Sequence, residues 1–584
     1  MDWISSTLEK FNPLDRLRSR FRSSEIWFIG LAMVAGIAAG LLTLFQSQLA
    51  HRLQQALFGL QPEQRLSAVE RIPFAALLVL PVGGLVVGAI TVLVRVRKRA
   101  LVDAVEANAL HGGRMSMRDS LLVSAQTIVS NGFGASVGLE AAYVQMGSGV
   151  ASAIGRGLHV RRSDLRTLVG AGSAGAIAAA FGAPLTGAFY AFEIVMGTYT
   201  PATLAPVAAA SLAAVLVAQA MGATPYLISV TPDAHLSPLD YALYIGLAAI
   251  CAAVGIALMR LVAVVETLVG RSALPVWLRP AVGGLLLVPL AAYTPQILSS
   301  GHGALSVELV AGFPLAFVAA IFLVKCVASV LSLGFGFRGG LFFAAIFLGA
   351  LAGDLYASLV NLAYGAKLLD GGDAAMVGIA ALSASIIGAP LTIAMLVLEA
   401  THDFVLTSAA IAGALICNTL VRNTFGYSFS TWRLHLRGQS IKSARDVGWT
   451  RLLSAGQMMR APTEAPAGMD VAEFRRRFPL GATTRVVLVD DEGRYAGIVL
   501  PAVAHGDTIK IDAPIEQVAT NQDRFVSGDT DVSSVLKAFD AAQSDELAVV
   551  DGDGRVLGIL SEAFVRKRYA EELEKHQREL FGER

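Results

Sequence analysis

An internal duplication is the feature that most constrains how this chain can fold. The pentapeptide GAPLT occurs at Gly182–Thr186 and again at Gly388–Thr392, and a glutamate lies eleven residues after the first glycine of each copy. A second pair of segments, 130–140 (SNGFGASVGLE) and 332–342 (SLGFGFRGGLF), is separated by 202 residues. Both pairs lie in apolar sequence interrupted by Gly and Pro. In a membrane, two related halves with broken helices indicate an ion or solute site near the midplane.

Composition places the chain among the membrane proteins. Of its 584 residues, 54% are hydrophobic and 16% are charged, whereas soluble proteins carry about 25% charged residues. Because a bilayer core requires about 20 apolar residues for each spanning helix, about ten or more membrane helices can be fitted, several of them short or tilted. The alternative, a large soluble protein with buried helices, is disfavoured by the same figures. The main apolar runs are 26–45, 74–94, 204–221, 241–265, 313–333 and 374–398.

Charge and cysteine usage argue against several other classes. The net charge of +1 argues against nucleic-acid binding. The three cysteines, Cys251, Cys326 and Cys417, lie in apolar segments without disulfide or metal-ligand spacing. The nine histidines show no ligand spacing either, and no nucleophile–base pair is evident. We therefore expect neither an enzyme nor a metal site.

Basic residues predict the orientation in the membrane. They cluster at 16–22, 95–99, 156–166 and 433–451. Such clusters favour the cytoplasmic side, although some of them could instead attract anions locally. We expect a multi-pass protein of a cell membrane, the inner membrane of a bacterium, with a cytoplasmic N-terminal helix (1–24) and a cytoplasmic C-terminal region.

The composition changes after about residue 437, where we expect the membrane part to end. A linker (438–455) leads into charged stretches that alternate with short Val/Ile/Leu strands. Two segments 61 residues apart, 485–500 and 546–561, each have the pattern of a strand, a tight Asp/Gly turn and a second strand. Each follows a helical stretch, and a charged helix ends the chain. This repeat predicts an α+β module of two halves, 456–515 and 516–580.

Glycines precede two expected helix starts in the duplicated segments. Three glycines of 130–140 and four of 332–342 come before apolar helices that begin near Glu140 and Leu341. Glycines leave backbone N–H groups approachable, and the helix dipole adds partial positive charge, so such a helix start suits an anion. An inverted repeat would direct both helix starts at one midplane point. The alternative is that these glycines serve tight helix packing.

Glu140 is the only acidic residue in the apolar stretch 121–154. An ionisable group inside a membrane is costly and is a functional candidate by default. At a helix start, its carboxylate could occupy an anion position when ionised and leave that position when protonated, which would make it a gate. The alternative is a capping carboxylate with a structural role.

The other acidic residues receive different expectations. Glu193 and Glu399 are related by the repeat, so we expect them to brace symmetric structure rather than to bind substrate. Asp103, Glu106 and Asp119 flank a basic segment, and we expect them to be solvated.

These segments resemble the CLC family of chloride channels and chloride/proton exchangers. The segment 138–148 (GLEAAYVQMGS) is similar to the family's GREGPTVQIG, and Glu140 falls on its gating glutamate. The segment 339–349 (GGLFFAAIFLG) is similar to GGIFAPMLALG, whose backbone amides bind the central anion. The segment 181–193 (FGAPLTGAFYAFE) also has a close counterpart in the family.

The resemblance covers nearly the whole chain. It implies an all-α, multi-span membrane domain (25–437) of two inverted halves, about 70–222 and 239–437, followed by a pair of CBS domains. It also implies a homodimer in the lipid bilayer, with an anion pore in each subunit. The anion-binding positions that it implies are Gly138, Leu139, Glu140, Leu341 and Phe342.

Several positions depart from the family pattern. Arg99 stands where the anion-binding serine of the family's GSGIP segment would fall, and Ser430 stands where the central tyrosine would fall. A three-residue shift would place Tyr427 at the tyrosine position instead. Ile194 replaces the internal proton-relaying glutamate of the exchangers, and Arg338 also differs from common family choices.

These departures favour passive or weakly proton-coupled movement of chloride or another small anion, because an apolar Ile194 cannot carry a proton. The alternative is a chloride/proton antiporter of the same family. A weaker ligand set could also loosen the preference for chloride over nitrate or bicarbonate. We expect no cofactor. CBS pairs often bind adenosine nucleotides, but Phe564 stands three residues after Ser561, where an Asp would hold the ribose. Nucleotide binding is thus unsupported, and a structural role at a dimer interface is equally open.

Overall fold

The computed structural model describes residues 24–95, 101–223, 236–311, 313–436, 453–506 and 509–581. The chain separates into two compact units, Met1–Arg445 and Asp446–Arg584, and each is described by itself. The division falls within the predicted linker. Apart from Ser24, the predicted N-terminal helix lies outside the described residues.

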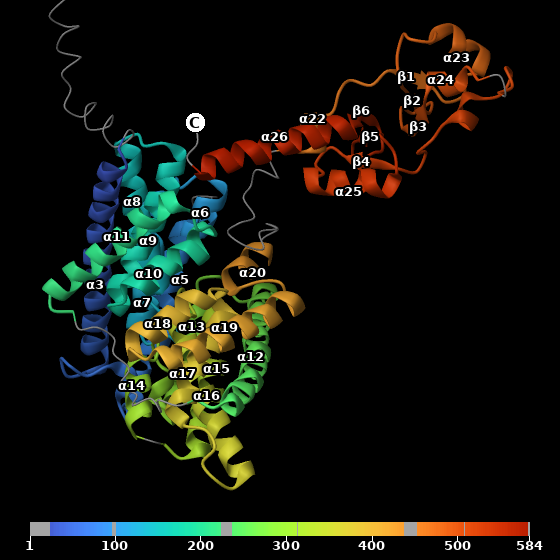
Figure 1. Ribbon diagram of the computed structural model, residues 1–584. Coiled ribbons are helices and arrows are strands. Elements are labelled where there is room, and N and C mark those ends of the chain that lie inside the picture. Colours follow the sequence, from blue (N-terminus) through green and yellow to red (C-terminus); the bar gives the residue numbers. More distant parts are fainter. Residues whose placement is uncertain are drawn as a thin grey trace, which may run out of the picture. The chain divides into compact units, whose positions relative to one another are not determined.

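The first unit is built of α-helices (Figure 1). Among the described residues, seven helical segments are long and apolar enough to cross a membrane. They lie in α3 (Glu25–Phe58), α4 and α5 (Phe74–Leu77, Val79–Arg95), α11 (Pro201–Ala220), α12 (Pro238–Arg271), α15 (Leu315–Gly334), α16 (Phe342–Tyr364), and α19 and α20 (Phe404–Thr424, Phe429–Leu436). Four shorter apolar helices add to them: α10 with the π-helical turn η2 (Pro184–Tyr190, Ala191–Met196), α13 (Arg279–Tyr293), α17 (Gly371–Ile387) and α18 (Pro390–Thr401). The predicted all-α, multi-span architecture is confirmed.

Shorter or more polar elements complete this unit. They are η1 (Leu66–Ala68), α6 (Ala104–Leu110), α7 (Met117–Gly132), α8 (Glu140–Gly157), α9 (Arg162–Phe181), η3 (Pro295–Ile297) and α14 (His302–Ala311). The expectation that Asp103, Glu106 and Asp119 are solvated is wrong for Glu106 and Asp119. Glu106 and Asp119 are only 6% and 8% exposed, because α6 packs on α8, α9 and η2, and α7 packs on α8. Asp103 is the N-cap of α6 and accepts a hydrogen bond from the Glu106 amide at 2.8 Å.

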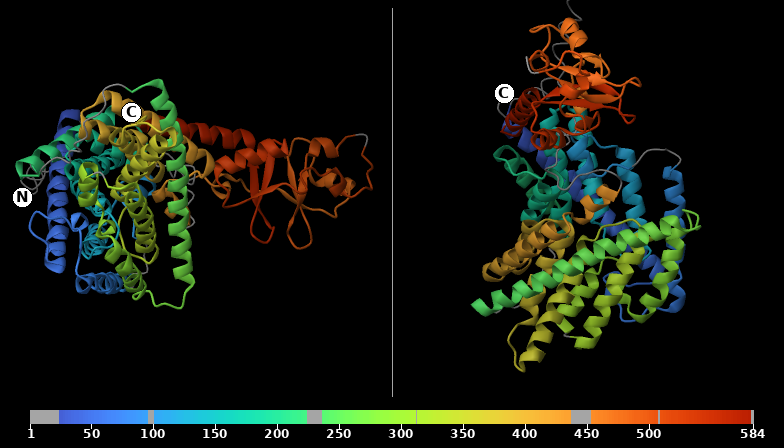
Figure 2. Two further views of the ribbon diagram at one scale, coloured as in Figure 1. Left: turned by 90° about the horizontal axis from the view of Figure 1, so that it is seen from below. Right: turned by 90° about the vertical axis from the view of Figure 1, so that its right-hand side faces the viewer.

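The duplication is visible in the packing of the two longest helices. Helices α3 and α12 each have 34 residues and stand at opposite edges of the helical unit (Figure 1, Figure 2). Helix α3 packs on α9 and α11, and α12 packs on α17 and α19. We therefore propose that the first half begins with α3, ahead of the predicted start near residue 70.

The two halves are held together by a crossed pair of helix caps. Glu193 Oε2 accepts hydrogen bonds from the amide and the hydroxyl of Thr392, both at 2.7 Å, at the start of α18. Glu399 Oε2 accepts from the amide and the hydroxyl of Thr186, at 2.8 and 2.6 Å, at the start of α10. Each GAPLT segment is thus capped by the glutamate of the other half, which agrees with the bracing role predicted for these glutamates.

The second unit contains two similar three-stranded sheets. In the first, β1 (Glu464–Pro466) runs parallel to β2 (Val486–Val489), which is antiparallel to β3 (Tyr495–Val499). In the second, β4 (Phe525–Ser527), β5 (Glu546–Val550) and β6 (Val556–Ser561) repeat this order. The helices of this unit are α22 (Ala455–Met458), α23 (Val471–Arg477), α24 (Pro501–Ala504), η4 (Ile515–Val518), α25 (Val532–Ala542) and α26 (Glu562–Phe581).

The sequence pattern predicted most of this module and missed one strand of each sheet. The two strand–turn–strand segments correspond to β2–β3 and β5–β6, and the helical stretches to α23, α25 and α26. Strands β1 and β4 have three residues each, too few for an alternating pattern to stand out. The predicted α+β module is confirmed.

Candidate functional site

Two helix starts lie side by side in the helical unit. Helix α8 begins at Glu140 and α16 begins at Phe342, at the spacing of the duplication. Just before them, Gly138 and Gly340 exchange two backbone hydrogen bonds, with N–O distances of 2.9 and 3.2 Å. Equivalent glycines of the two halves therefore pair with each other, and both helices start from this pair.

Neither N-cap residue caps its own helix with a side chain. The N-cap residues are Leu139 and Leu341, which have no side-chain acceptor. The first N–H groups of an α-helix have no partner within the helix, and the helix dipole adds partial positive charge to them. Because leucine stands at both N-caps, the first amides of α8 and α16 can be approached by an anionic group from elsewhere.

The Glu140 carboxylate lies at these helix starts. Glu140 is 4% exposed, and the backbone amides of Glu140 itself and of Phe343, in the first turn of α16, donate hydrogen bonds to it. Its Oε2 atom makes no hydrogen bond within the described part of the chain. A Cβ atom on Gly138 would lie 1.9 Å from Oε2, and one on Gly340 would lie 3.3 Å from it. Glycine at position 138 is therefore required for the carboxylate to reach α16.

Two cavities meet at Glu140. The first, called the arginine cavity, has a volume of about 180 Å³, and its lining includes Arg338, Arg433, Ser430, Ile194 and Phe342. The second, called the histidine cavity, has a volume of about 320 Å³, and its lining includes His51, His302, Arg65, Tyr143 and Ser300. Among the described residues, Glu140 alone lines both cavities. Its side chain thus separates one cavity from the other.

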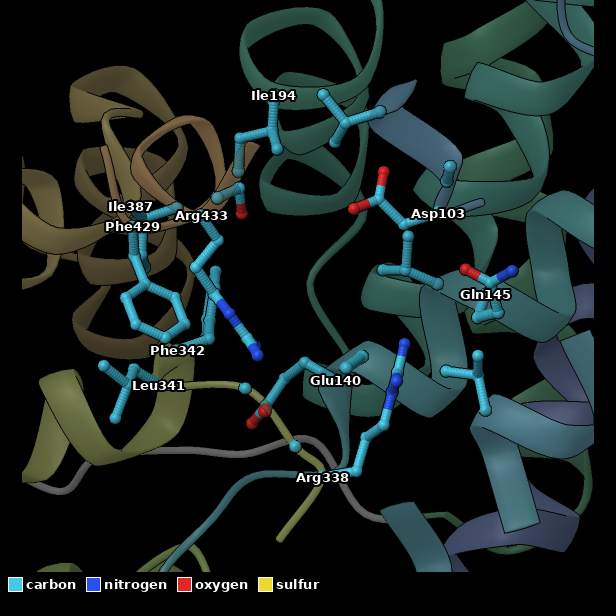
Figure 3. Close-up of a pocket in the computed structure, with 18 of the residues that line it drawn as sticks. Asp103, Glu140, Gln145, Ile194, Arg338, Leu341, Phe342, Ile387, Phe429 and Arg433 are labelled. Carbon is cyan, nitrogen blue, oxygen red and sulfur yellow. The ribbon is translucent and has the colours of Figure 1, made fainter. Parts of the chain in front are cut away.

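The structure brings four of the predicted positions together with Glu140. Leu341, Phe342 and Ile194 line the arginine cavity (Figure 3), and Ser430 lines it as well. Ile194 comes from η2, the π-helical turn that follows α10, and Ser430 comes from the first turn of α20.

The remaining predicted positions are Leu139, Gly138 and Arg99. Leu139 lines the histidine cavity. Gly138 acts through its missing Cβ, which makes room for the Glu140 carboxylate. Arg99 lies outside the described residues.

The geometry distinguishes the two placements of the family's central tyrosine. Tyr427 belongs to an aromatic cluster with Phe425, Trp432 and His435. Its hydroxyl lies 3.3 Å from His435 Nδ1, and Tyr427 is not among the residues that line the arginine cavity. Ser430 does line this cavity, and its placement at the tyrosine position stays a prediction.

Sequence reasoning did not place two arginines at this site. Arg338 comes from the loop before α16 and Arg433 comes from α20. In Figure 3 their guanidinium groups extend into the arginine cavity on either side of Glu140. In the sequence, Arg338 stands out only as a departure from the family pattern, and Arg433 only as part of a basic cluster. Neither observation predicts which cavity the guanidinium group of a long side chain reaches. Asp103 lines the same cavity.

A buried lysine supports the histidine cavity. Lys325, in α15, is 0% exposed, and its Nζ atom donates to the carbonyl oxygens of Ile297 and Ser299, both at 2.9 Å. Because Ser299 lines the histidine cavity, this lysine fixes part of the cavity wall. The signal was present in the sequence, since Lys325 is the only charged residue in the apolar run 313–333.

Comparison with known protein families gives two matches. The family model described as voltage gated chloride channel matches residues 83–422. The CBS domain model matches residues 508–563.

Individual relatives agree with these matches. A putative chloride channel protein ClcB-like of Ralstonia nicotianae is 30% identical over 389 residues, which cover 64% of this chain and 89% of the relative. A voltage-gated ClC-type chloride channel ClcB of Escherichia coli O81 is 28% identical over 61% of this chain and 86% of its own length.

Solved structures share the fold. A slow cyanobacterial Cl−/H+ antiporter superposes with a TM-score of 0.61 at 20% identity, over 70% of this chain and 97% of its own. A eukaryotic CLC transporter superposes with a TM-score of 0.57 at 16% identity, over 94% of this chain and 98% of its own. At these identities the likeness shows the fold alone.

Proposed function

The chain belongs to the voltage-gated chloride channel family, and we propose that it moves chloride or another small anion across a membrane. The observation that carries this proposal is the position of Glu140, which lines both cavities. Movement of this one side chain would join the cavities into a path, and the starts of α8 and α16 would then face the passing anion. Glu140 is thus proposed as the gate.

The proposed ligands of the anion follow from the same geometry. The backbone amides of Leu341 and Phe342 at the start of α16 are the main donors, supported by the helix dipole. On the α8 side, Gly138, Leu139 and Glu140 supply the backbone. The Ser430 hydroxyl adds a side-chain donor in the arginine cavity. Arg99 remains a proposed contributor by sequence position alone.

We propose that transport is passive or only weakly coupled to protons. Ile194 lines the arginine cavity, where it offers an apolar side chain that cannot relay a proton. The two relatives named above are described as chloride channels, which agrees with this mode. A chloride/proton antiporter is the alternative, and the experiment below distinguishes the two.

The setting of the protein is also proposed. Arg433, which belongs to the basic cluster 433–451, lines the arginine cavity, and by the positive-inside tendency this cavity would face the cytoplasm. We propose a homodimer in a bacterial inner membrane, with the N-terminus and the CBS pair in the cytoplasm. Binding of an adenosine nucleotide at the CBS pair is not supported, because Phe564 stands where an Asp would hold the ribose.

The test is anion efflux from proteoliposomes loaded with chloride, measured with and without a pH gradient. We expect valinomycin-dependent chloride efflux in the presence of potassium and little proton movement. A reversal potential that follows the pH gradient would establish the antiporter instead. Efflux no faster than from protein-free liposomes would contradict anion transport altogether.

A further inference from the structure

We infer that the hydroxyl of Tyr190 is a further ligand of the anion in the arginine cavity. The ligand class is a small monovalent anion that accepts a hydrogen bond, with chloride as the probe. This inference rests on the proposed anion transport and deepens it, because it adds a side-chain donor from α10 to the backbone amides at the start of α16.

The first observation is the place of Tyr190 in the fold. Tyr190 is the last residue of α10, and it lines the arginine cavity together with Ile194, four residues further along. Its ring packs against the ring of Phe342, the first residue of α16, with 5.9 Å between the two ring centroids. The side chain therefore lies beside the helix start that is proposed to hold the anion.

The second observation is that the protein leaves this hydroxyl open. No described residue forms a hydrogen bond with the Tyr190 hydroxyl, and its oxygen is not one of the sealed-in polar atoms that lack a partner. Because the oxygen is neither bonded nor enclosed by packed atoms, it faces the cavity that the side chain lines. Tyrosine hydroxyls in protein interiors usually find a hydrogen-bond partner, so this donor is available to a ligand.

The charges around the hydroxyl suit a neutral donor. The carboxylates of Glu140 and Asp103 act electrostatically on Tyr190, and both share the cavity with Arg338 and Arg433. These four side chains have no net formal charge when all are ionised. A phenol carries an O–H donor and no charge, so it can bind an anion that takes the place of the Glu140 carboxylate without disturbing this balance.

Other polar side chains in the lining are less well placed as donors. Gln145, from α8, lines the cavity, but its Nε2 atom donates to the carbonyl oxygen of Val102 at 3.0 Å. Ser430 offers a hydroxyl from α20. A tyrosine hydroxyl stands much further from its backbone than a serine hydroxyl does. Tyr190 can therefore present its donor away from the cavity wall while its ring stays packed.

The experiment measures chloride binding to the detergent-purified full chain by calorimetry, with gluconate as the buffer anion, and chloride flux in proteoliposomes. Tyr190→Phe removes the hydroxyl and keeps the ring that packs on Phe342. The matched control is Tyr244→Phe, because Tyr244 is a buried tyrosine of α12 that lines neither cavity. Both variants are also made in the Glu140→Gln background, where no carboxylate competes for the Tyr190 hydroxyl.

Loss of one hydrogen bond to a charged ligand should weaken chloride binding by about tenfold in Tyr190→Phe. We expect this loss in both backgrounds, and Tyr244→Phe should bind chloride as its parent does. An unchanged chloride affinity in Tyr190→Phe would overturn the inference. So would a loss that occurs only when Glu140 is present, because the hydroxyl would then act on the gate and not on the anion. Weakened binding in Tyr190→Phe, with no chloride flux through the wild type, would contradict the proposed transport and leave the Tyr190 ligand standing.

Discussion

A buried carboxylate with one oxygen atom outside any hydrogen bond lowers the stability of the fold, so its presence suggests that its position serves function. Glu140 is such a residue, and the glycine at 138 preserves the space that it occupies. In its ionised form it competes with any anion for the start of α16. In its protonated form it carries no negative charge, so it no longer competes with the anion for this position.

Glu140→Gln should therefore imitate the protonated state. We expect wild-type anion flux to rise as the pH falls from neutral to acidic, and flux through the variant to be high at both pH values. The measurement is chloride efflux from proteoliposomes at two pH values. Glu106→Gln is the control, because Glu106 is similarly buried and lines neither cavity. An identical pH response in wild type and Glu140→Gln would remove Glu140 as the gate.

Ile194 provides a second test at the scale of one residue. Because it lines the arginine cavity, a carboxyl group placed there by Ile194→Glu would face the cavity, where it could exchange protons with water. We expect this variant to fold and to show proton movement driven by a chloride gradient, which the wild type should lack. The control is Ile387→Glu, which places an acid elsewhere in the same lining. If both variants conduct and neither moves protons, position 194 is not the missing relay.

At the scale of helices, the crossed caps explain why the duplicated GAPLT segments share a glutamate at one fixed offset. Each carboxylate accepts three hydrogen bonds from the other half, two from backbone amides and one from a hydroxyl. The halves are therefore joined by charge-assisted hydrogen bonds at both ends of the pseudo-symmetric pair. Neither cap contributes to the walls of the two cavities.

Removing the charge from either cap should weaken the fold and leave anion selectivity unchanged. Hydrogen bonds to charged groups contribute about 1.5–3 kcal/mol each, so Glu193→Gln and Glu399→Gln should each lower the free energy of unfolding by about that amount. The measurement is thermal unfolding in detergent, with the exposed Glu63→Gln as the control. Because the contacts are symmetric, a large effect of one variant and none of the other would contradict the crossed-cap account.

A carboxylate in the second unit allows a prediction about pH. Glu546 Oε1 pairs with Arg485 Nη1 at 2.9 Å and joins the β2–β3 half to the β5–β6 half. Burial raises the pKa of the Glu546 carboxyl above its ordinary value, and Arg485 offsets this only in part. The folded state then holds its proton to higher pH than the unfolded state does. The free energy of unfolding must therefore fall as the pH rises above the ordinary pKa of 4.5.

Glu546→Gln should flatten this fall, since the group that titrates is gone. The measurement is pulse proteolysis of the full chain in urea at several pH values, following the fragment that carries the CBS pair. Glu492→Gln, which removes an exposed carboxylate of the same unit, should keep the wild-type slope. A Glu546→Gln variant with the wild-type slope would show that another group controls it.

At the scale of the whole molecule, features that depend on local sequence pattern could be predicted from the sequence, and features that depend on long-range packing could not. The duplication, the broken helices, the helix starts near Glu140 and Leu341 and the second unit's strand pairs depend on nearby residues, and the structure agrees with these predictions, with α16 beginning one residue later, at Phe342. The burial of Glu106 and the reach of Arg433 depend on which distant helices pack beside them. Which residue near Ser430 faces the arginine cavity likewise depends on the turn between α19 and α20, and no periodic sequence pattern predicts the conformation of that turn.

The described parts of the proposed path can all be built from one chain. Both cavities, the two helix starts and Glu140 come from a single subunit. If the homodimer forms, each subunit should conduct independently, because the family resemblance implies an anion pore in each subunit. We therefore expect transport by a mixed population to be the sum of its subunits.

The test is to reconstitute wild type and Glu140→Gln from cells that express both chains in known ratios. If each subunit is a complete path, the pH-dependent part of the flux should fall in proportion to the fraction of wild-type chains. If two subunits must act together, it should fall with the square of that fraction, because only wild-type pairs would respond. A covalently linked pair with one variant subunit provides a fixed ratio, and half of the wild-type pH response is expected from it. A response near zero in the linked pair would mean that the gate is shared between subunits.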